Sequence, residues 1–291
     1  MWEAIISFFL TSVLSVFAKK TGFLDHPDSR KSHGRAVPPV GGVSIFLTLL
    51  IFERDNPFFL FSIPLFLLGL LDDLFDLSYR IKLAVTTLVA VWFSTAVTIE
   101  VSIFGARIHP VFFVIWFVGM VNAFNVVDGL DGLLSGISLF SSLMIGERSL
   151  AFSIIGFLPW NLPDAKVFLG NSGSFLLGAY LSTSSVVFFE GDLGYATLFL
   201  GFPFYEIVFS FVRRLVVKKN PFSPDEKHTH HVFSRKIGKW KTLLILVSFS
   251  LMFNLLGLSQ KFYLILLYVV LCCVLLFTYC VLQRGDGNLK L

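Results

Sequence analysis

The most constraining feature of this sequence is a succession of apolar runs, most of them close to the length that crosses a membrane. A spanning helix needs roughly 17–25 largely apolar residues. The chain of 291 residues is 55% apolar and 14% charged, whereas a soluble domain carries roughly a quarter charged residues. The sequence therefore predicts an all-α polytopic membrane protein, with 1–291 forming one domain. A bundle of about 10–11 transmembrane helices is expected, over 1–18, 40–53, 57–71, 81–103, 109–127, 130–146, 149–162, 172–189, 193–217, 242–259 and 262–282.

The distribution of basic residues predicts how these helices are oriented. Lys19 and Lys20 follow the first run instead of preceding it, which favours a retained helix with the N-terminus outside. With that start, four of the 23 Lys and Arg residues fall in outside turns. The others lie in inside segments, as the positive-inside rule requires, and the C-terminus is cytoplasmic. The motifs that carry chemistry lie at about 20–231 on the inner face, and 240–291 holds the last two helices and a tail.

A polar stretch at 122–136 interrupts the apolar pattern. Asn122, Asn125, Asp128 and Asp131 lie where hydrocarbon should begin, and such groups are costly to desolvate unless they serve a function. If the segment is helical, Asn125, Asp128 and Asp131 follow each other at steps of three residues and share broadly one side. The alternative is an ordinary polar loop between two spanning helices.

Two adjacent carboxylates, Asp72 and Asp73, end another apolar run. Each raises the pKa of the other, and both favour a nearby cation. They are candidates for a general base or for carboxylates beside Mg²⁺. The alternative is an ion pair at the helix end with Arg80 or Lys82.

Two glycine motifs open predicted helices. Gly41-Gly42 and the turn Gly170-Asn171-Ser172-Gly173-Ser174 each place backbone N–H groups at a helix start, where anions bind. Both motifs favour phosphate binding. Glycine and serine turns are also common helix starts without any ligand, and the basic loop before Gly41 also fits a patch that faces anionic lipid.

Basic residues gather near 213–231, namely Arg213, Arg214, His228, His230 and His231. Three histidines so close together suggest zinc, but one short segment supplies few ligands and no cysteine is near. Cationic side chains together fit a pyrophosphate better. A solvated basic loop is the alternative.

Taken together, these motifs indicate phosphoryl-group transfer at a membrane surface. Acids and amides suit Mg²⁺, which prefers oxygen ligands and bridges phosphates, while bases suit the phosphates themselves. An ion-coupled transporter is the competing class. It needs access from both sides of the membrane, whereas the acids here gather on one face.

The ordered set of motifs resembles the polyprenyl-phosphate N-acetylhexosamine-1-phosphate transferase family, the glycosyltransferase 4 group. The matching pieces are Gly22–Pro27, Arg30-Lys31, His33, Pro38–Gly42, Gly69–Asp73, Asn122–Gly132, Gly170–Ser174 and His228–His231. The His-x-His-His segment is similar to that of the WecA/TagO-like branch, which is related to MraY.

The resemblance implies transfer of N-acetylhexosamine 1-phosphate, most closely GlcNAc 1-phosphate from UDP-GlcNAc, to undecaprenyl phosphate, with release of UMP. It also implies Mg²⁺, with Mn²⁺ as a substitute, and a cytoplasmic-face active site in the bacterial inner membrane. The reaction would begin assembly of a cell-envelope glycopolymer such as lipopolysaccharide or teichoic acid. The resemblance implies no nucleic-acid partner and is compatible with a homodimer. An MraY-like phospho-MurNAc-pentapeptide transferase is the alternative.

The resemblance further assigns roles to individual residues. The catalytic set is Asp72, Asp73 and Asp128, and the metal-proximal set is Asn125 and Asn171. The substrate-binding set comprises Asn122, Asp131, Lys82, Arg213, Arg214, His228, His230, His231, Gly41 and Gly42. The family has Asp where Asn171 stands here, and a neutral amide is a poorer ligand for Mg²⁺ than a carboxylate. Our hypothesis is that this chain binds metal weakly and is impaired, unless another residue compensates.

Overall fold

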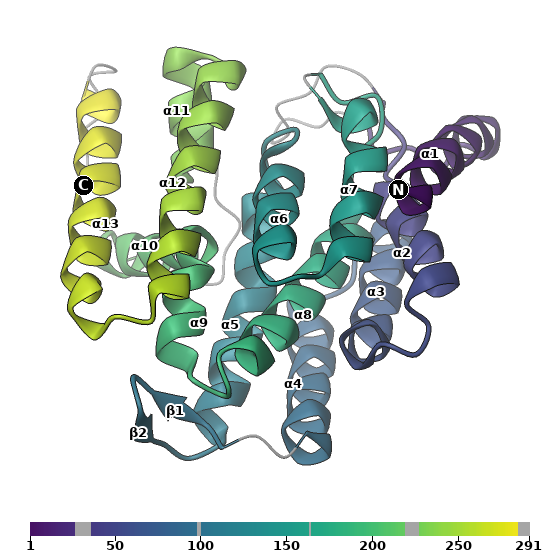
Figure 1. Cartoon of the computed structure of the whole chain (residues 1–291). Helices are drawn as coiled ribbons and strands as arrows, with labels where there is room; N and C mark the ends of the chain where they lie inside the picture. Colours follow the sequence, from purple (N-terminus) through teal and green to yellow (C-terminus); the bar gives the residue numbers. More distant parts are fainter. Residues whose placement is uncertain (27–35, 98–99, 163, 219–226, 285–291) are drawn as a thin grey trace.

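The computed structural model describes residues 1–26, 36–97, 100–162, 164–218 and 227–284, and expectations for 27–35 and 219–226 lie outside them. The described chain is almost entirely helical (Figure 1). Its α-helices are α1 (Trp2–Thr21), α2 (Gly41–Phe52), α3 (Pro57–Phe75), α4 (Tyr79–Ala96), α5 (Val111–Val127), α6 (Leu133–Met144), α7 (Arg148–Asn161), α8 (Gly170–Phe188), α9 (Leu193–Phe199), α10 (Gly201–Val216), α11 (Thr229–Ile237), α12 (Lys239–Ser259) and α13 (Ile265–Arg284). A 3₁₀ turn, η1 (Phe262–Leu264), precedes α13.

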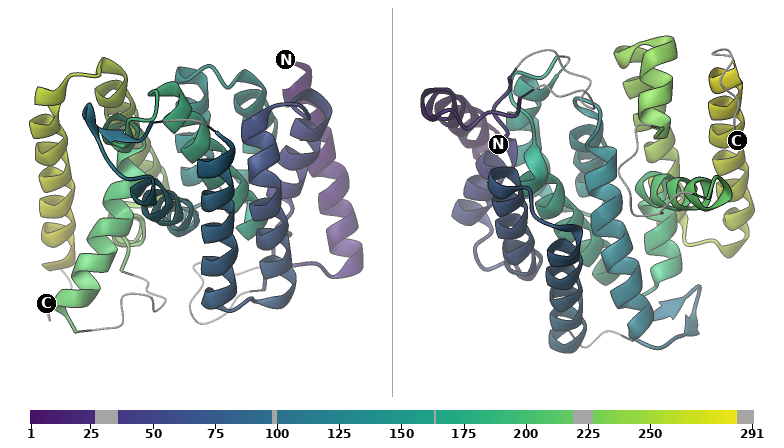
Figure 2. Two further views of the ribbon diagram at one scale, coloured as in Figure 1. Left: turned by 90° about the horizontal axis from the view of Figure 1, so that it is seen from below. Right: turned by 180° about the vertical axis from the view of Figure 1, so that it is seen from behind.

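The helices confirm an all-α multi-pass membrane protein. By length and apolar composition, α1, α3, α12 and the span Phe262–Gln283 can each cross a bilayer. The pair α9 and α10 passes the same test as one span bent by 93°. The helices α2, α5 and α6 are apolar but shorter. The views in Figures 1 and 2 place α1 and α13 on opposite flanks of the bundle.

Two expected helices differ from the structure. The helix expected at 81–103 ends at Ala96, and a hairpin of β1 (Ser102–Ile103) and β2 (Ala106–Arg107) follows. The buried carboxylate of Asp192 accepts the N–H groups of Phe104 and Gly105, at 3.0 and 2.7 Å, and so holds the hairpin turn. The two N–H groups lie outside any helix, and the carboxylate supplies the hydrogen-bond acceptor that they need.

The helix expected at 193–217 is broken at Leu200. Pro203 has no N–H to donate to the carbonyl of Phe199, four residues earlier, so that carbonyl must be paired elsewhere. Asn254 of α12 donates its Nδ2–H to the oxygen of Phe199 at 2.6 Å and thereby stabilises the bend. As a result, α10 lies across the neighbouring helices in Figure 1 instead of along them.

The helix α8 forms the centre of the bundle, packed against α2, α3 and α5. Every residue from Ser172 to Val186 is buried. A side chain at Gly42 of α2 would collide with the backbone of Gly173, and one at Gly69 of α3 would collide with the backbone of Asn171. This close approach places the end of α3 directly beside the start of α8.

Candidate active site

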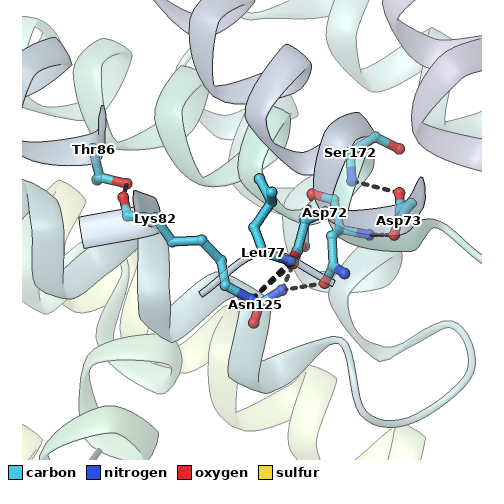
Figure 3. Close-up of polar contacts among 9 residues, drawn as sticks. Asp72, Asp73, Leu77, Lys82, Thr86, Asn125 and Ser172 are labelled. Atoms are coloured by element: carbon cyan, nitrogen blue, oxygen red, sulfur yellow. Dashed lines mark hydrogen bonds and ion pairs between the residues drawn. The ribbon is translucent and has the colours of Figure 1, made fainter. Parts of the chain in front are cut away.

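Asp72, near the end of α3, is paired with Lys82 in the first turns of α4. Lys82 Nζ lies 3.0 and 2.9 Å from the two oxygens of Asp72, and the Leu77 N–H donates to Asp72 Oδ1 at 2.8 Å (Figure 3). The Asp72 side chain is 3% exposed and that of Lys82 is 25% exposed. The helix-end ion pair that the sequence left as an alternative is therefore present. A phosphate or cation that binds here competes for one of these partners.

Asp73 holds the start of α8. Its two oxygens accept the N–H groups of Asn171 and Ser172, at 2.8 and 3.0 Å (Figure 3), and α8 has no cap from its own neighbouring side chain. The expectation that this turn offers those N–H groups to a bound anion is wrong. A carboxylate of the protein already occupies that place, where the helix favours negative charge.

Asn125 joins the last turn of α5 to this cluster. Its Nδ2 donates to Asn171 Oδ1 at 2.8 Å and to Ser174 Oγ at 3.0 Å. The structure thus brings together the two side chains expected near a metal. The ends of α3 and α5 and the start of α8 meet at one place.

Asp128 caps the C-terminus of α5, which ends at Val127, so the helical spacing considered for Asn125, Asp128 and Asp131 is not formed. The residue is half-buried overall, but its carboxyl lies deep. Burial, followed by repulsion from the carboxylates of Asp73 and Asp131, raises the pKa of Asp128 well above its usual value. Close carboxylates of this kind favour a cation among them.

The remaining polar side chains of the 122–136 stretch have protein partners. Asp131 Oδ2 accepts from Lys239 Nζ at 2.9 Å and from the Ala165 N–H at 3.3 Å. Asn122 Nδ2 donates to the Val118 carbonyl of its own helix at 2.7 Å. Asp131 therefore lies on the side of the site that faces α12.

The histidine segment begins a helix, α11, instead of forming a basic loop. The rings of His230 and His231 press against Gly129, where any side chain would collide with His230 Nε2. His230 is fully buried, and neither ring nitrogen has a partner among the described residues. Burial, then the neighbouring His231 and His228, lowers the pKa of His230 well below its usual value. This lowered pKa favours the neutral imidazole and counts against a cationic role for His230.

The arginine and glycine pairs are placed differently from what their motifs suggested. Arg213 and Arg214 form the last turn of α10, where Arg213 lies 5.9 Å from the Phe209 ring centre and Arg214 is buried. The Gly41 and Gly42 N–H groups donate to the carbonyls of Phe168 and Leu169, at 2.9 and 2.8 Å. Those two N–H groups are therefore already bonded, and the glycine pair serves the packing of α2 on α8.

The donor set fits a hard, oxygen-seeking cation better than zinc. Among the described residues, no group of three or more His, Cys, Asp or Glu is arranged to hold a metal. Asn125 and Asn171 carry amide oxygens and Asp128 carries carboxyl oxygens, which are the ligand types that Mg²⁺ prefers. Burial, followed by repulsion from Asp73 and Asp131, raises the pKa of Asp128, and a cation bound beside these acids would oppose that rise.

Three side chains that the sequence reading missed support the site. Glu206 Oε1 lies 3.2 Å from His228 Nδ1. Lys239 forms an ion pair with Asp131. Asn161 Oδ1 accepts the Gly132 N–H at 2.9 Å. Glu206 carried a usable signal, because it is a carboxylate inside an apolar run. Nothing local in the sequence marks Lys239 or Asn161, which reach the site from distant helices.

These features define a multi-pass helical membrane protein in which acids, amides and histidines from separate helices meet at one end of the bundle. Residues 57–189 match the model of glycosyl transferase family 4. The chain is 98% identical over its full length to an undecaprenyl-phosphate α-N-acetylglucosaminyl 1-phosphate transferase of Thermotoga maritima, and covers 100% of that protein.

More distant relatives give the same result. A probable undecaprenyl-phosphate N-acetylglucosaminyl 1-phosphate transferase of Bacillus subtilis is 30% identical over 76% of this chain and 72% of its own length. The undecaprenyl-phosphate α-N-acetylglucosaminyl 1-phosphate transferase of Escherichia coli K12 is 30% identical over 79% of this chain and 76% of its own. The chain belongs to glycosyl transferase family 4, which confirms the resemblance seen in its motifs.

Proposed function

We propose that this protein transfers GlcNAc 1-phosphate from UDP-GlcNAc to undecaprenyl phosphate. An oxygen of the lipid phosphate attacks the phosphorus that carries the sugar. A new P–O bond forms, the bond from that phosphorus to the bridging oxygen breaks, and UMP leaves with that oxygen. The observation that carries this proposal is the 98% identity, over the whole chain, to the Thermotoga maritima enzyme of that name.

The geometry supports a division of the site into two sides. Asp72 and Lys82 lie on one side, where Lys82 can move its charge from Asp72 to the phosphate of the lipid. Asp72, freed in this way, is then the group placed to take a proton from that phosphate. Asp128 and Asp131 are assigned to the donor, where they would orient the nucleotide-sugar. Asp73 is less suited to be the base, because both of its oxygens accept backbone N–H groups.

Mg²⁺ would be held by the side-chain oxygens of Asn125 and Asn171, with Asp128 close by; Mn²⁺ is the expected substitute. When bound, the ion supplies positive charge to the diphosphate. Asn171 Oδ1 accepts from Asn125 Nδ2 in the structure, so the Asn125 amide would have to turn for both oxygens to face one ion. An amide at position 171 also brings no negative charge, which supports the hypothesis that metal affinity is low in this chain.

The charge distribution supports one orientation in the membrane. The N-terminus lies outside, the C-terminus lies in the cytoplasm, and the chain crosses the inner membrane eleven times. The active site then faces the cytoplasm, where UDP-GlcNAc is made. A homodimer remains part of the proposal.

The direct test is release of UMP by the purified protein in detergent or nanodiscs. The mixture contains UDP-GlcNAc, undecaprenyl phosphate and Mg²⁺, with EDTA, omission of the lipid, and Asp72→Asn as controls. UMP formation that needs both substrates and the metal supports the proposal. Failure of the wild type at saturating Mg²⁺, together with failure of Asn171→Asp, would refute it.

The choice of donor needs a second arm. UDP-GlcNAc and UDP-MurNAc-pentapeptide are offered together, and the lipid products are separated. Preference for the pentapeptide donor would replace the proposed activity by the MraY-like alternative. Flux of an ion or solute without any UMP would favour the transporter class.

A further inference from the structure

A fully buried carboxylate, Glu206, lies in the middle of α10. Of the residues expected to bind substrate phosphates, Glu206 contacts His228. It is 0% exposed and is the only acid in α10. A buried charge is costly unless it is paired and hydrogen-bonded. Glu206 Oε1 accepts the Thr229 N–H at 2.9 Å and lies 3.2 Å from His228 Nδ1. Ser210 Oγ lies 2.9 Å from the same nitrogen.

These contacts fix the beginning of α11. The helix has no side-chain cap from His228, its own N-cap residue, and the first N–H groups of a helix need an acceptor. Glu206 supplies that acceptor from a different helix. On the other flank, Tyr279 of α13 donates its hydroxyl to the Lys227 carbonyl at 3.1 Å. The start of α11 is thus held between α10 and α13.

The far side of this helix start meets the active site. The His228 ring stacks on that of His230, with centroids 5.6 Å apart, and His230 and His231 lie 4.3 Å apart. His230 and His231 contact Gly129, which directly follows Asp128. A shift at Thr229 would therefore move both rings relative to the carboxyl of Asp128.

We propose that Glu206 is a positioning residue for the donor side of the site, acting through Thr229 and His228 on the histidines beside Asp128. This inference rests on the proposed function, because the histidines matter only if a nucleotide-sugar binds there. Glu206 itself touches no reacting atom. Its effect is to hold the rings within the small tolerance that catalysis demands.

The kinetic test uses two variants in which the new side chains at position 206 are of nearly equal size. Glu206→Gln keeps an acceptor for the Thr229 N–H, whereas Glu206→Met removes it. We expect Glu206→Met to raise the KM for UDP-GlcNAc and to lower kcat/KM for that donor by about 10–100-fold, while the KM for undecaprenyl phosphate is unchanged. Glu206→Gln should recover most of the loss.

A purely structural role gives a different result. If Glu206→Met only reduced the number of folded molecules, kcat would fall and both KM values would stay as in the wild type. That outcome overturns the proposal, and so does a Glu206→Met enzyme with wild-type constants. A cycle with His231→Ala adds a check, because Glu206→Met should cost much less once His231 is gone; full additivity contradicts the pathway through α11.

A measurement without catalysis separates this inference from the proposed function. Release of the α11 start should speed tryptic cleavage after Lys227 in Glu206→Met but not in Glu206→Gln, in detergent with no substrate present. Equal cleavage of all three proteins overturns the role of Glu206. If neither the wild type nor Asn171→Asp releases UMP but this cleavage pattern is seen, the proposed function is refuted and the hold of Glu206 on α11 is established.

Discussion

The contact between Asp73 and α8 predicts that the second acid of the pair is needed more for the fold than for the chemistry. In Asp73→Asn, one of the two N–H groups bonded at 2.8 and 3.0 Å keeps an acceptor, and the charge at the helix start is lost. A hydrogen bond to a charged group contributes about 1.5–3 kcal/mol, and charge at a helix N-terminus about 0.3–1 kcal/mol. The partial burial of this charge offsets some of that stabilisation, so the expected loss is at most about 2–4 kcal/mol.

For a chain of 291 residues, that loss corresponds to a fall in apparent melting temperature of roughly 3–7 °C. Intrinsic fluorescence of the purified variants in one detergent measures it. Asp76→Asn is the matched control, because Asp76 is exposed at the end of the same helix with φ of 48°, a conformation that Asn adopts readily. Asp76→Asn should melt with the wild type. An Asp73→Asn protein that melts with the wild type but releases no UMP would refute the capping role and make Asp73 a reacting group.

Three further outcomes follow from the site. Asn171→Asp should increase Mg²⁺-dependent UMP release and lower the Mg²⁺ concentration needed; equal rates in the two proteins would remove the hypothesis of impairment. Lys82→Met leaves the carboxylate of Asp72 buried without its partner, so melting should indicate a loss of about 2–3 kcal/mol, below the range for a fully buried pair because Lys82 is partly exposed. Adding Asp72→Asn should restore most of that loss, and no recovery would contradict the pairing. Because folding raises the pKa of Asp128, the folded protein holds a proton that the unfolded chain releases, so stability should fall as the pH rises from about 4 towards the raised pKa. Melting between pH 5 and 8 without metal should show this fall in the wild type and a flatter curve in Asp128→Asn; parallel curves would count against it.

The sequence could predict which helix ends meet, because polar residues at the ends of apolar runs are costly anywhere else. Asp72, Asn125 and Asn171 were found in this way, and the structure brings their helix ends together. It could not predict which acid pairs with which partner. Asp72 forms an ion pair with Lys82, whereas Asp73 accepts the first N–H groups of α8. Which acid has which partner depends on the direction in which α3 approaches α8.

Glycine was the least informative signal. Gly41 and Gly42 fit a phosphate loop and a close helix contact equally well on sequence, since both uses need the absence of a side chain. Only the collision that a Cβ at Gly42 would make with Gly173 identifies the second use. The break at Leu200 was missed because hydropathy records apolar character and not direction, although Pro203, which lacks an N–H for the Phe199 carbonyl, marks it in the sequence. The residue that stabilises the break, Asn254, lies on another helix.

The close contacts of α8 also bear on how such an enzyme can diverge. Its neighbours α2 and α3 touch its backbone at glycines, so a larger residue at these positions would separate the helices and pull Asn171 away from Asn125. Substitutions should therefore accumulate on the outward faces of α1 and α13, which are mostly exposed on the flanks of the bundle. Lineages with different membranes can then keep one reaction centre while exchanging most of its surroundings.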